Sequence, residues 1–209
     1  MIKAVIFDID GVLIDSFERN FRLFRDLIKD VRHKKTLTRK EYKTFFHLTA
    51  EDTLKASTGI ANKKEINRLM ENLRGYRHTV PLKIIPNSVQ IIKQLADKYK
   101  LALVTSRIKS GVWDYLQASN TTGFFKVIVH FGHYKNPKPH PEPLLVACKR
   151  LKIKPAEAVY IGDTKADIQS AKAAGIKVIL FSQNKITGAD AYAKKFLKIP
   201  EVIKKLKLP

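Results

Sequence analysis

Helical and strand-like patterns alternate from residue 88 to residue 181 of this chain. The amphipathic helical patterns cover residues 88–99, 109–116, 141–151 and 165–174. The short apolar runs that follow them cover residues 101–105, 127–129, 158–161 and 177–181, and another apolar run opens the chain at residues 2–9. Such alternation is typical of parallel sheets, because two parallel strands need a crossover connection that is usually a helix. We therefore predict an α/β fold, a doubly wound parallel sheet with helices on both faces.

One long insertion interrupts this order after the first apolar run. Between residues 15 and 81 the apolar residues recur at helical spacing, and no convincing strand pattern is present. The two clearest stripes consist of Phe17, Phe21, Phe24, Leu27 and Ile28, and of Ile66, Leu69, Met70 and Leu73. Pro81 and Pro86 then mark the return to the alternating pattern. We predict a core domain of residues 1–14 and 82–209 and an inserted α-helical domain at residues 15–81.

The chain is strongly basic, with a formal net charge of +21 over 209 residues. Such a charge attracts polyanions, so nucleic acid has to be considered as a partner. The basic residues are nevertheless spread over both predicted domains, and the densest run, Lys29 to Lys43, has few aromatic neighbours. We therefore favour a solvated basic surface that steers small phosphorylated anions, with a nucleic-acid face as the alternative.

Hydropathy and cysteine content restrict where such a chain works. No apolar run reaches the length of a membrane span, and the N-terminus lacks the layout of a secretory signal. Cys148 is the only cysteine, so an intrachain disulfide cannot form. It lies in an apolar stretch of a predicted helix and is expected in the core. These features favour a cytoplasmic protein without a membrane partner.

Polar side chains with related chemistry follow four of the predicted strands. They are Asp8 with Asp10, then Thr105-Ser106-Arg107, then Lys138, then Asp163 with Asp167. In open α/β sheets, ligands bind beyond the carboxyl ends of the strands, so these groups should converge on one crevice. Carboxylate oxygens suit Mg²⁺, and lysine and hydroxyl groups suit phosphoryl oxygens. The pattern therefore indicates phosphoryl chemistry at this edge of the sheet.

The same residues also have simpler, structural interpretations. Asp163 and Asp167 could cap the helix that begins near residue 165, and Thr105 could satisfy a strand end. Lys138 could be an ordinary surface lysine, although the proline on each side of it disfavours this.

Together the motifs resemble those of the haloacid dehalogenase superfamily. In chain order they are Phe7-Asp8-Ile9-Asp10-Gly11-Val12, Leu103-Val104-Thr105-Ser106, Lys138-Pro139-His140-Pro141-Glu142-Pro143, and Ile161-Gly162-Asp163-Thr164 with Asp167. Within the superfamily the chain is similar to the phosphatases that have a helical cap inserted after the first motif. Phosphoglycolate phosphatases and β-phosphoglucomutases belong to that group. The resemblance covers nearly the whole core and is weak across residues 30–80.

The resemblance implies a role for each residue of the first two motifs. Asp8 matches the nucleophile that forms an aspartyl-phosphate, and it also matches a metal ligand. Asp10 matches the general acid and base, and its main-chain carbonyl matches a further metal ligand. Thr105 matches the hydroxyl that binds the phosphoryl group, with the Ser106 amide assisting. Arg107 follows this turn and is a candidate substrate contact, with a solvated helix start as the alternative.

The later motifs complete the implied site. Lys138 matches the lysine that holds Asp8 and offsets negative charge on the transferring phosphoryl group. Asp163 matches the side-chain ligand of the metal. Asp167 matches either a second ligand or an acceptor of a hydrogen bond from water on the metal. The cofactor that this set implies is Mg²⁺.

The function implied by the resemblance is Mg²⁺-dependent hydrolysis of a small phosphomonoester through an aspartyl-phosphate. Two alternatives stay open: a sugar-phosphate mutase of the β-phosphoglucomutase type, and a nucleic-acid-binding or regulatory protein on a phosphatase fold. Mutases carry a histidine shortly after the first motif, and residues 15–20 contain none, which disfavours the mutase. Asn87 stands where relatives usually carry glycine, a departure outside the four motifs.

Overall fold

The structure is a computed structural model that describes residues 1–32, 36–46, 48–75, 80–183 and 186–206. It divides into two compact units, one of Met1–Asp15 with Ile84–Pro209 and one of Ser16–Lys83. The predicted domain boundaries, after residues 14 and 81, lie within two residues of these divisions. Part of the basic run from Lys29 to Lys43 falls outside the described ranges.

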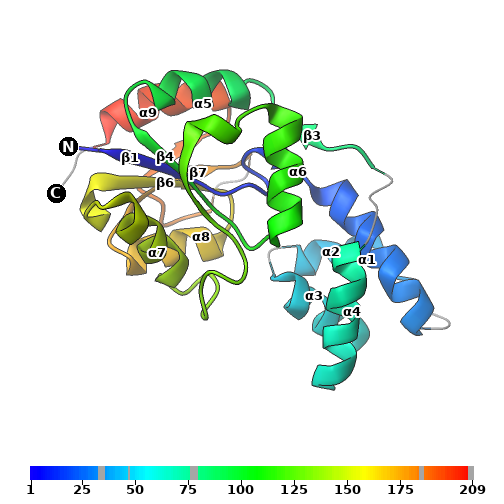
Figure 1. Cartoon of the computed structure of the whole chain (residues 1–209). Coiled ribbons are helices and arrows are strands. Elements are labelled where there is room, and N and C mark those ends of the chain that lie inside the picture. The colour runs from blue at the N-terminus through cyan, green and yellow to red at the C-terminus, as the bar shows by residue number, and fades with distance from the viewer. Residues whose placement is uncertain (33–35, 47, 76–79, 184–185, 207–209) are drawn as a thin grey trace. The chain divides into compact units, whose positions relative to one another are not determined.

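A six-stranded sheet forms the centre of the first unit (Figure 1). Its order is β5-β4-β1-β6-β7-β8, and every neighbouring pair is parallel. The strands are β1 Ala4–Phe7, β4 Lys100–Val104, β5 Phe125–Val129, β6 Ala158–Gly162, β7 Lys177–Phe181 and β8 Ala191–Ala193. Phe7, the last residue of β1, is in register with Leu103 on one side and Ile161 on the other. The predicted doubly wound α/β fold is confirmed, and its strand order reverses at β1.

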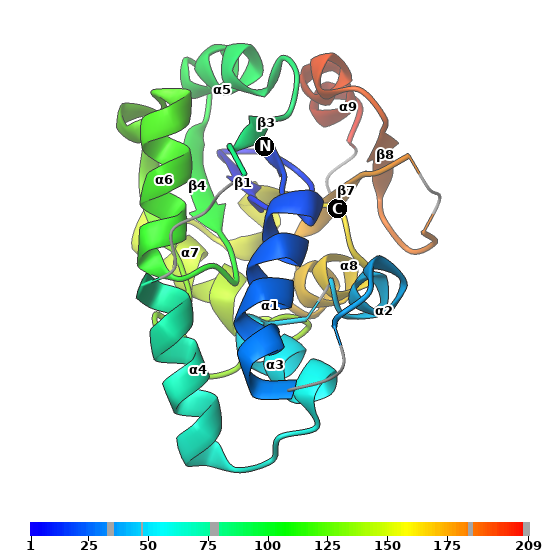
Figure 2. The same ribbon diagram turned by 90° about the vertical axis from the view of Figure 1, so that its right-hand side faces the viewer.

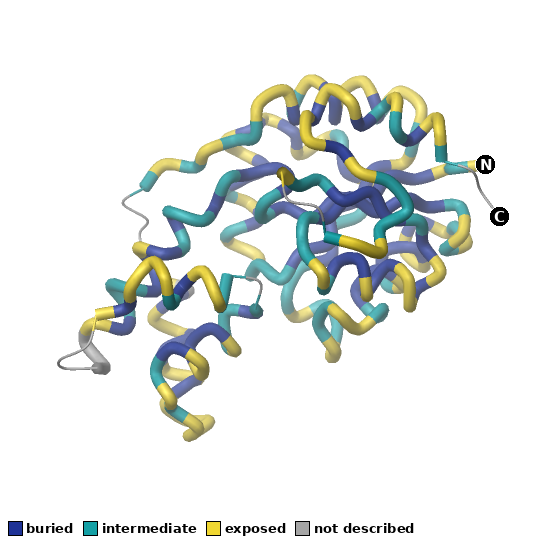
Figure 3. The backbone as a smooth tube through the Cα atoms, turned by 180° about the vertical axis from the view of Figure 1, so that it is seen from behind, coloured by how far each residue is buried: buried dark blue, intermediate teal, exposed yellow. Residues whose placement is uncertain are grey.

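Helices cover both faces of this sheet. The helices α5 (Ser88–Ala96) and α9 (Ile199–Lys205) lie on one face, and α7 (Glu142–Leu151) and α8 (Lys165–Ala173) lie on the other (Figure 1). A further helix, α6, covers Lys109–Ser119. The strand residues that face α7 and α8 are buried, except for the partly buried Val127, so the sheet forms the dark centre of the tube in Figure 3. Cys148 belongs to this core, as predicted.

The second unit is built from helices in its described residues, as the apolar stripes predicted, with only its last residue, Lys83, in a strand (Figure 2). They are α1 Phe17–Arg32, α2 Arg39–Phe45, α3 Ala50–Thr58 and α4 Lys63–Gly75. The buried ring of Tyr42 lies 5.4 Å from the ring of Phe17 and 5.8 Å from that of Phe21, centroid to centroid. Thr38 and Glu41 form a capping box that satisfies the first amides of α2. No helix in the described ranges has both the length and the apolar character of a membrane span.

Several short elements escaped the sequence prediction. The strands β2 (Ile14–Asp15) and β3 (Lys83–Ile84) pair with each other, and β8 and α9 follow the last predicted strand. None is long enough to establish an alternating or helical period. Asn87 has a φ of 65°, in the left-handed region where glycine is favoured. Asparagine adopts this conformation more readily than most other residues, so the glycine expected from the resemblance is replaced without a change in backbone geometry.

Candidate active site

The loop after β1 carries the first two aspartates and depends on a glycine. The Asp8 amide donates to the Ile161 carbonyl oxygen at 2.9 Å, which continues the sheet pairing by one residue. The Ile9 amide donates to Asp8 Oδ1 at 2.7 Å and fixes the carboxylate. Gly11 has a φ of 72°, and a Cβ there would overlap the Asp163 carboxylate. Only glycine therefore allows this loop to approach Asp163 so closely.

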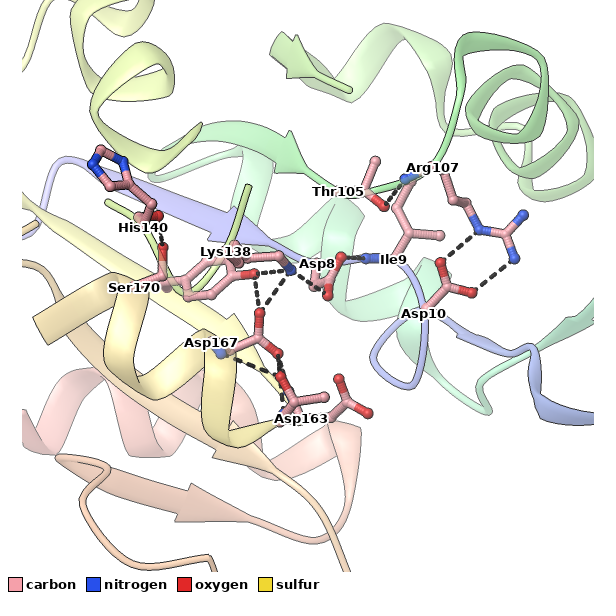
Figure 4. Close-up of polar contacts among 12 residues, drawn as sticks. Asp8, Ile9, Asp10, Thr105, Arg107, Lys138, His140, Asp163, Asp167 and Ser170 are labelled. Carbon is pink, nitrogen blue, oxygen red and sulfur yellow. Dashed lines mark hydrogen bonds and ion pairs between the residues drawn. The ribbon is translucent and has the colours of Figure 1, made fainter. Parts of the chain in front are cut away.

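Lys138 connects two of the predicted carboxylates. Its Nζ lies 2.7 Å from Asp8 Oδ2 and 2.7 Å from Asp167 Oδ1, and it donates to Tyr160 Oη at 3.0 Å (Figure 4). The side chains of Lys138 and Asp8 are 8% and 9% exposed, and that of Asp167 is fully buried. The three partners occupy the three donor positions of an ammonium group. Lys138 is therefore a fixed member of the site and not a surface lysine.

Asp167 has acceptor contacts on both of its oxygens. Besides Lys138, Oδ1 accepts a hydrogen bond from Tyr160 Oη at 2.8 Å. Oδ2 accepts from the Asp163 amide at 3.2 Å, from the Thr164 amide at 3.0 Å and from Thr164 Oγ1 at 2.7 Å. Thr164 is the N-cap of α8 and forms a capping box with Asp167. The capping interpretation of Asp167 is therefore confirmed, and the same carboxylate also contacts Lys138.

Burial shifts the titration of the two least compensated carboxylates. It raises the pKa of Asp8 to about 7, and the negative charges of Asp167 and Asp10 add to this rise. The Lys138 ammonium opposes the rise but does not cancel it. Burial likewise raises the pKa of Asp163 well above its usual value, with Asp167 and Asp8 contributing further. Burial therefore disfavours the charged form of both carboxyl groups, and the neighbouring aspartates add to this effect.

The charges of Asp167 and Lys138, in contrast, are well compensated by their neighbours. Burial alone would raise the pKa of Asp167, but the charge and hydrogen bond of Lys138, with those from Thr164 and Tyr160, hold it below its usual value. Burial would lower the pKa of Lys138, but the charges of Asp167 and Asp8 outweigh this effect and raise it. Lys138 and Asp167 therefore form a stable ion pair around which the rest of the site is arranged.

The second motif lies where β4 ends. The Thr105 amide donates to the Val129 carbonyl oxygen at 3.0 Å, and Thr105 Oγ1 accepts from the Arg107 amide at 3.2 Å. Tyr134 Oη donates to the Thr105 carbonyl oxygen at 3.1 Å and braces the turn. Thr105 is buried and Ser106 is half-buried. The turn is therefore held by hydrogen bonds at both the amide and the carbonyl group of Thr105.

Asp10 pairs with Arg107 and not with Lys138 (Figure 4). Arg107 Nε donates to Asp10 Oδ2 at 2.7 Å, and Arg107 Nη2 donates to Asp10 Oδ1 at 2.8 Å. Such a two-pronged contact is the strongest geometry for a guanidinium and a carboxylate. The side chains are 10% and 27% exposed, so the pair is shielded from water only in part. Sequence reasoning placed both residues in the site but did not predict this contact.

Three carboxylates are close enough to share one cation. Among the described residues, one oxygen from each of Asp8, Asp163 and Asp167 lies within 4.8 Å of the other two. The Asp10 side chain does not belong to this group of described residues. The five contacts on Asp167 leave its oxygens less available than those of Asp8 and Asp163. The donor set is hard oxygen, which is what Mg²⁺ requires.

Tyr160 is a site residue that the sequence analysis missed. It lies in β6 within the apolar run Ala158–Gly162, and its Oη contacts both Lys138 and Asp167. A tyrosine in a fully buried strand needs a hydrogen-bond partner for its hydroxyl group. This requirement was the feature of the sequence that could have indicated a polar site beside the strand. The partner is the ion pair at the centre of the site.

Tyr160→Phe tests whether this hydroxyl positions Lys138. We expect kcat to fall roughly 10-fold or more with little change in KM, because the ammonium loses one of three anchors while the Thr105 turn is intact. The measurement is steady-state kinetics on the best substrate, with thermal unfolding to confirm the fold. The matched control is Tyr192→Phe, at an exposed tyrosine of β8. A fall in kcat no larger than that of the control would contradict the positioning role.

The chain also resembles known proteins in sequence. Residues 5–181 match the family model described as haloacid dehalogenase-like hydrolase. Pyrophosphatase PpaX of Bacillus pumilus (strain SAFR-032) is 32% identical over 177 residues, which cover 84% of this chain and 81% of that protein. Pyrophosphatase PpaX of Anoxybacillus flavithermus (strain DSM 21510 / WK1) is 28% identical over 182 residues, with the same two coverages.

Solved structures share the fold at lower identity. A predicted phosphoglycolate phosphatase from Haemophilus somnus 129PT has a TM-score of 0.84 and 22% identity, covering 97% of this chain and 98% of that chain. The β-phosphoglucomutase of Clostridium difficile has a TM-score of 0.83 and 21% identity, covering 98% and 97%. The family match extends over most of the sequence and includes all four motifs. The chain therefore belongs to the haloacid dehalogenase-like hydrolases, and the resemblance inferred from its motifs is confirmed.

Proposed function

We propose that this hydrolase is a Mg²⁺-dependent phosphatase that forms an aspartyl-phosphate on Asp8. The observation that carries the proposal is the Lys138 ammonium, held 2.7 Å from Asp8 Oδ2 by its pairing with Asp167. An ammonium in that place offsets charge on a phosphoryl group next to the nucleophile. We further propose a cytoplasmic enzyme, with unit Ser16–Lys83 as its cap domain.

The proposed reaction has two steps that use the same pair of aspartates. In the first, an Asp8 oxygen attacks phosphorus, the bond to the leaving oxygen breaks, and Asp10 protonates that oxygen. In the second, Asp10 takes a proton from water, which attacks the aspartyl-phosphate and releases inorganic phosphate. Thr105 and the Ser106 amide bind the phosphoryl oxygens throughout.

The charge of the carboxylate cluster supports the choice of a divalent cation. When all are ionised, Asp8, Asp163 and Asp167 outweigh Lys138 by two negative charges, and the raised pKa values of Asp8 and Asp163 are consistent with this excess. Asp8, Asp163 and the Asp10 carbonyl would hold Mg²⁺, and we assign Asp167 to the supporting role because its oxygens are occupied. The ion would neutralise charge on the transferring phosphoryl group.

The affinity for Mg²⁺ should increase as the pH rises from acidic to slightly alkaline values. A proton on Asp8 competes with the metal, and its pKa of about 7 means that this proton leaves as the pH passes through that range. We expect the Mg²⁺-induced rise in melting temperature to grow from about pH 5 to about pH 8. Asp163→Ala should abolish the Mg²⁺-induced rise at every pH. A rise that is the same at both ends of the range would contradict the assignment.

Inorganic pyrophosphate is a second candidate substrate. The observation that favours it is the similarity to proteins named pyrophosphatase PpaX, at 32% and 28% identity. A phosphomonoester and pyrophosphate would use the same transfer to Asp8, and they differ only in what leaves.

The test is a panel of phosphorylated metabolites with pyrophosphate, assayed for phosphate release with Mg²⁺ and with EDTA. We expect Mg²⁺-dependent release from at least one compound and none in EDTA. A hexose phosphate primed with its bisphosphate belongs in the panel, since isomerisation without release would favour a mutase. Absence of turnover with every compound, together with salt-dependent binding to random DNA, would favour the nucleic-acid alternative.

A further inference from the structure

We propose that Arg107 selects substrates whose leaving group is itself an anion, so that the enzyme prefers phosphoanhydrides such as pyrophosphate to esters of neutral alcohols. The inference rests on the proposed function, in which Asp8 is the nucleophile and Asp10 the general acid. It adds a specificity role for one residue and a chemical class of substrate.

Arg107 lies next to Asp10, the proposed general acid. A general acid must come within hydrogen-bond reach of the leaving oxygen. The Arg107 guanidinium lies 2.7 and 2.8 Å from the two oxygens of that acid. A group attached to the leaving oxygen therefore departs within a few ångströms of the guanidinium. A second phosphate can accept two parallel hydrogen bonds from a guanidinium, which a neutral alcohol cannot.

The two-pronged contact also has to open before Asp10 can act. Both Asp10 oxygens accept from Arg107, so the acid is engaged while this ion pair persists. The leaving phosphate of pyrophosphate offers the guanidinium equivalent acceptor oxygens in place of the Asp10 carboxylate. With a neutral leaving group nothing replaces Asp10, and the acid stays paired. An anionic leaving group therefore binds Arg107 and frees Asp10 to take up the proton that it then donates to the leaving oxygen.

The neighbouring helix leaves room for this guanidinium. Gly111 lies in the first turn of α6, and a Cβ there would come within 3.1 Å of Arg107 Nη1. Glycine is disfavoured in helices relative to alanine. Its presence at this point is consistent with space kept for the arginine head.

The chemistry of the favoured reaction balances without a further reactant. An Asp8 oxygen forms a bond to one phosphorus of pyrophosphate, and the bond from that phosphorus to the bridging oxygen breaks. The bridging oxygen keeps the electron pair, takes the proton from Asp10 and leaves as inorganic phosphate beside Arg107. Water then hydrolyses the aspartyl-phosphate, and a second phosphate is released.

The experiment compares pyrophosphate with phenyl phosphate, which transfers the same phosphoryl group but loses a neutral phenol. For Arg107→Gln we expect kcat/KM for pyrophosphate to fall roughly 100-fold or more and that for phenyl phosphate to change by less than about 5-fold in either direction. Arg107→Lys should lie between wild type and Arg107→Gln for pyrophosphate, because it keeps the charge but loses the fork. The control Lys109→Gln removes an exposed cation two residues away and should lower both by the same small factor.

The outcomes separate this inference from the proposed function. A wild-type enzyme that hydrolyses neither compound, nor any in the metabolite panel, defeats the proposed function itself. Hydrolysis of phenyl phosphate but not pyrophosphate by the wild type overturns only the assignment of Arg107. Equal losses on both compounds in Arg107→Gln overturn it as well, since Arg107 would then act only through Asp10. Melting temperatures of all three variants show whether the comparison is made on folded protein, and Arg107→Lys repeats the test if Arg107→Gln fails to fold.

Discussion

Asp8→Asn should lower turnover by roughly 10³-fold or more while the protein stays folded. The substitution preserves size and one carbonyl oxygen but removes the charge that attacks phosphorus. Folding should be little affected, because burial raises the pKa of Asp8 to about 7 and thus disfavours its charged form, so that loss of this charge costs the fold little. The measurement is kcat on the best substrate, with thermal unfolding in parallel.

A second measurement distinguishes a lost nucleophile from a distorted site. Acid-quenched wild-type enzyme should carry phosphate that hydroxylamine removes, as expected of an acyl phosphate, and Asp8→Asn should carry none. Asp97→Asn is the matched control, because Asp97 is exposed at the end of α5. Near-wild-type turnover in Asp8→Asn would show that the reaction does not pass through a covalent bond to this residue.

Asp163→Ala should abolish activity to a similar degree and at the same time stabilise the metal-free protein. Loss of a hard oxygen ligand removes several kcal/mol of charge stabilisation from the transferring phosphoryl group, so kcat should fall roughly 10³-fold or more. The same change removes a carboxylate whose pKa is raised well above normal by burial and by the charges of Asp167 and Asp8. A group with a raised pKa destabilises the folded state at neutral pH, and its removal relieves that cost.

Differential scanning calorimetry in EDTA and in Mg²⁺ tests both halves of this prediction. In EDTA the variant should melt above the wild type. In Mg²⁺ the wild type should gain stability, and the variant should gain none. The isosteric variant Asp163→Asn provides the control for volume, and it should follow Asp163→Ala in both respects. Full activity of the wild type in EDTA, or a variant that still gains stability from Mg²⁺, would contradict the role of Asp163.

The sequence predicted the sheet and the members of the site because one topological rule connects them. Asp8, Thr105 and Asp163 each follow a strand, and the carboxyl ends of parallel strands share one edge of a sheet. Knowledge of the strands was therefore enough to bring the side chains together. The helical unit was equally predictable, since its apolar residues keep a helical period.

The contacts within the site were not predictable in the same way. The Arg107–Asp10 pair joins residues 97 positions apart, and the Tyr160–Asp167 hydrogen bond depends on how α8 packs beside β6. Such contacts follow from side-chain directions that strand order does not determine. The short strands β2 and β3 were missed for a related reason, because two residues cannot display a period.

The five contacts of Asp167 bear on how divergent relatives of this chain should be judged. Its carboxylate starts a helix, joins that helix to a strand and holds a lysine. Natural selection for a folded protein would thus preserve this aspartate even after catalysis had been lost. Retention of Asp167 is therefore weak evidence that a homologue is still an enzyme. Asp163, whose burial costs the metal-free fold stability, is the position whose replacement would first reveal a lineage that has abandoned the reaction.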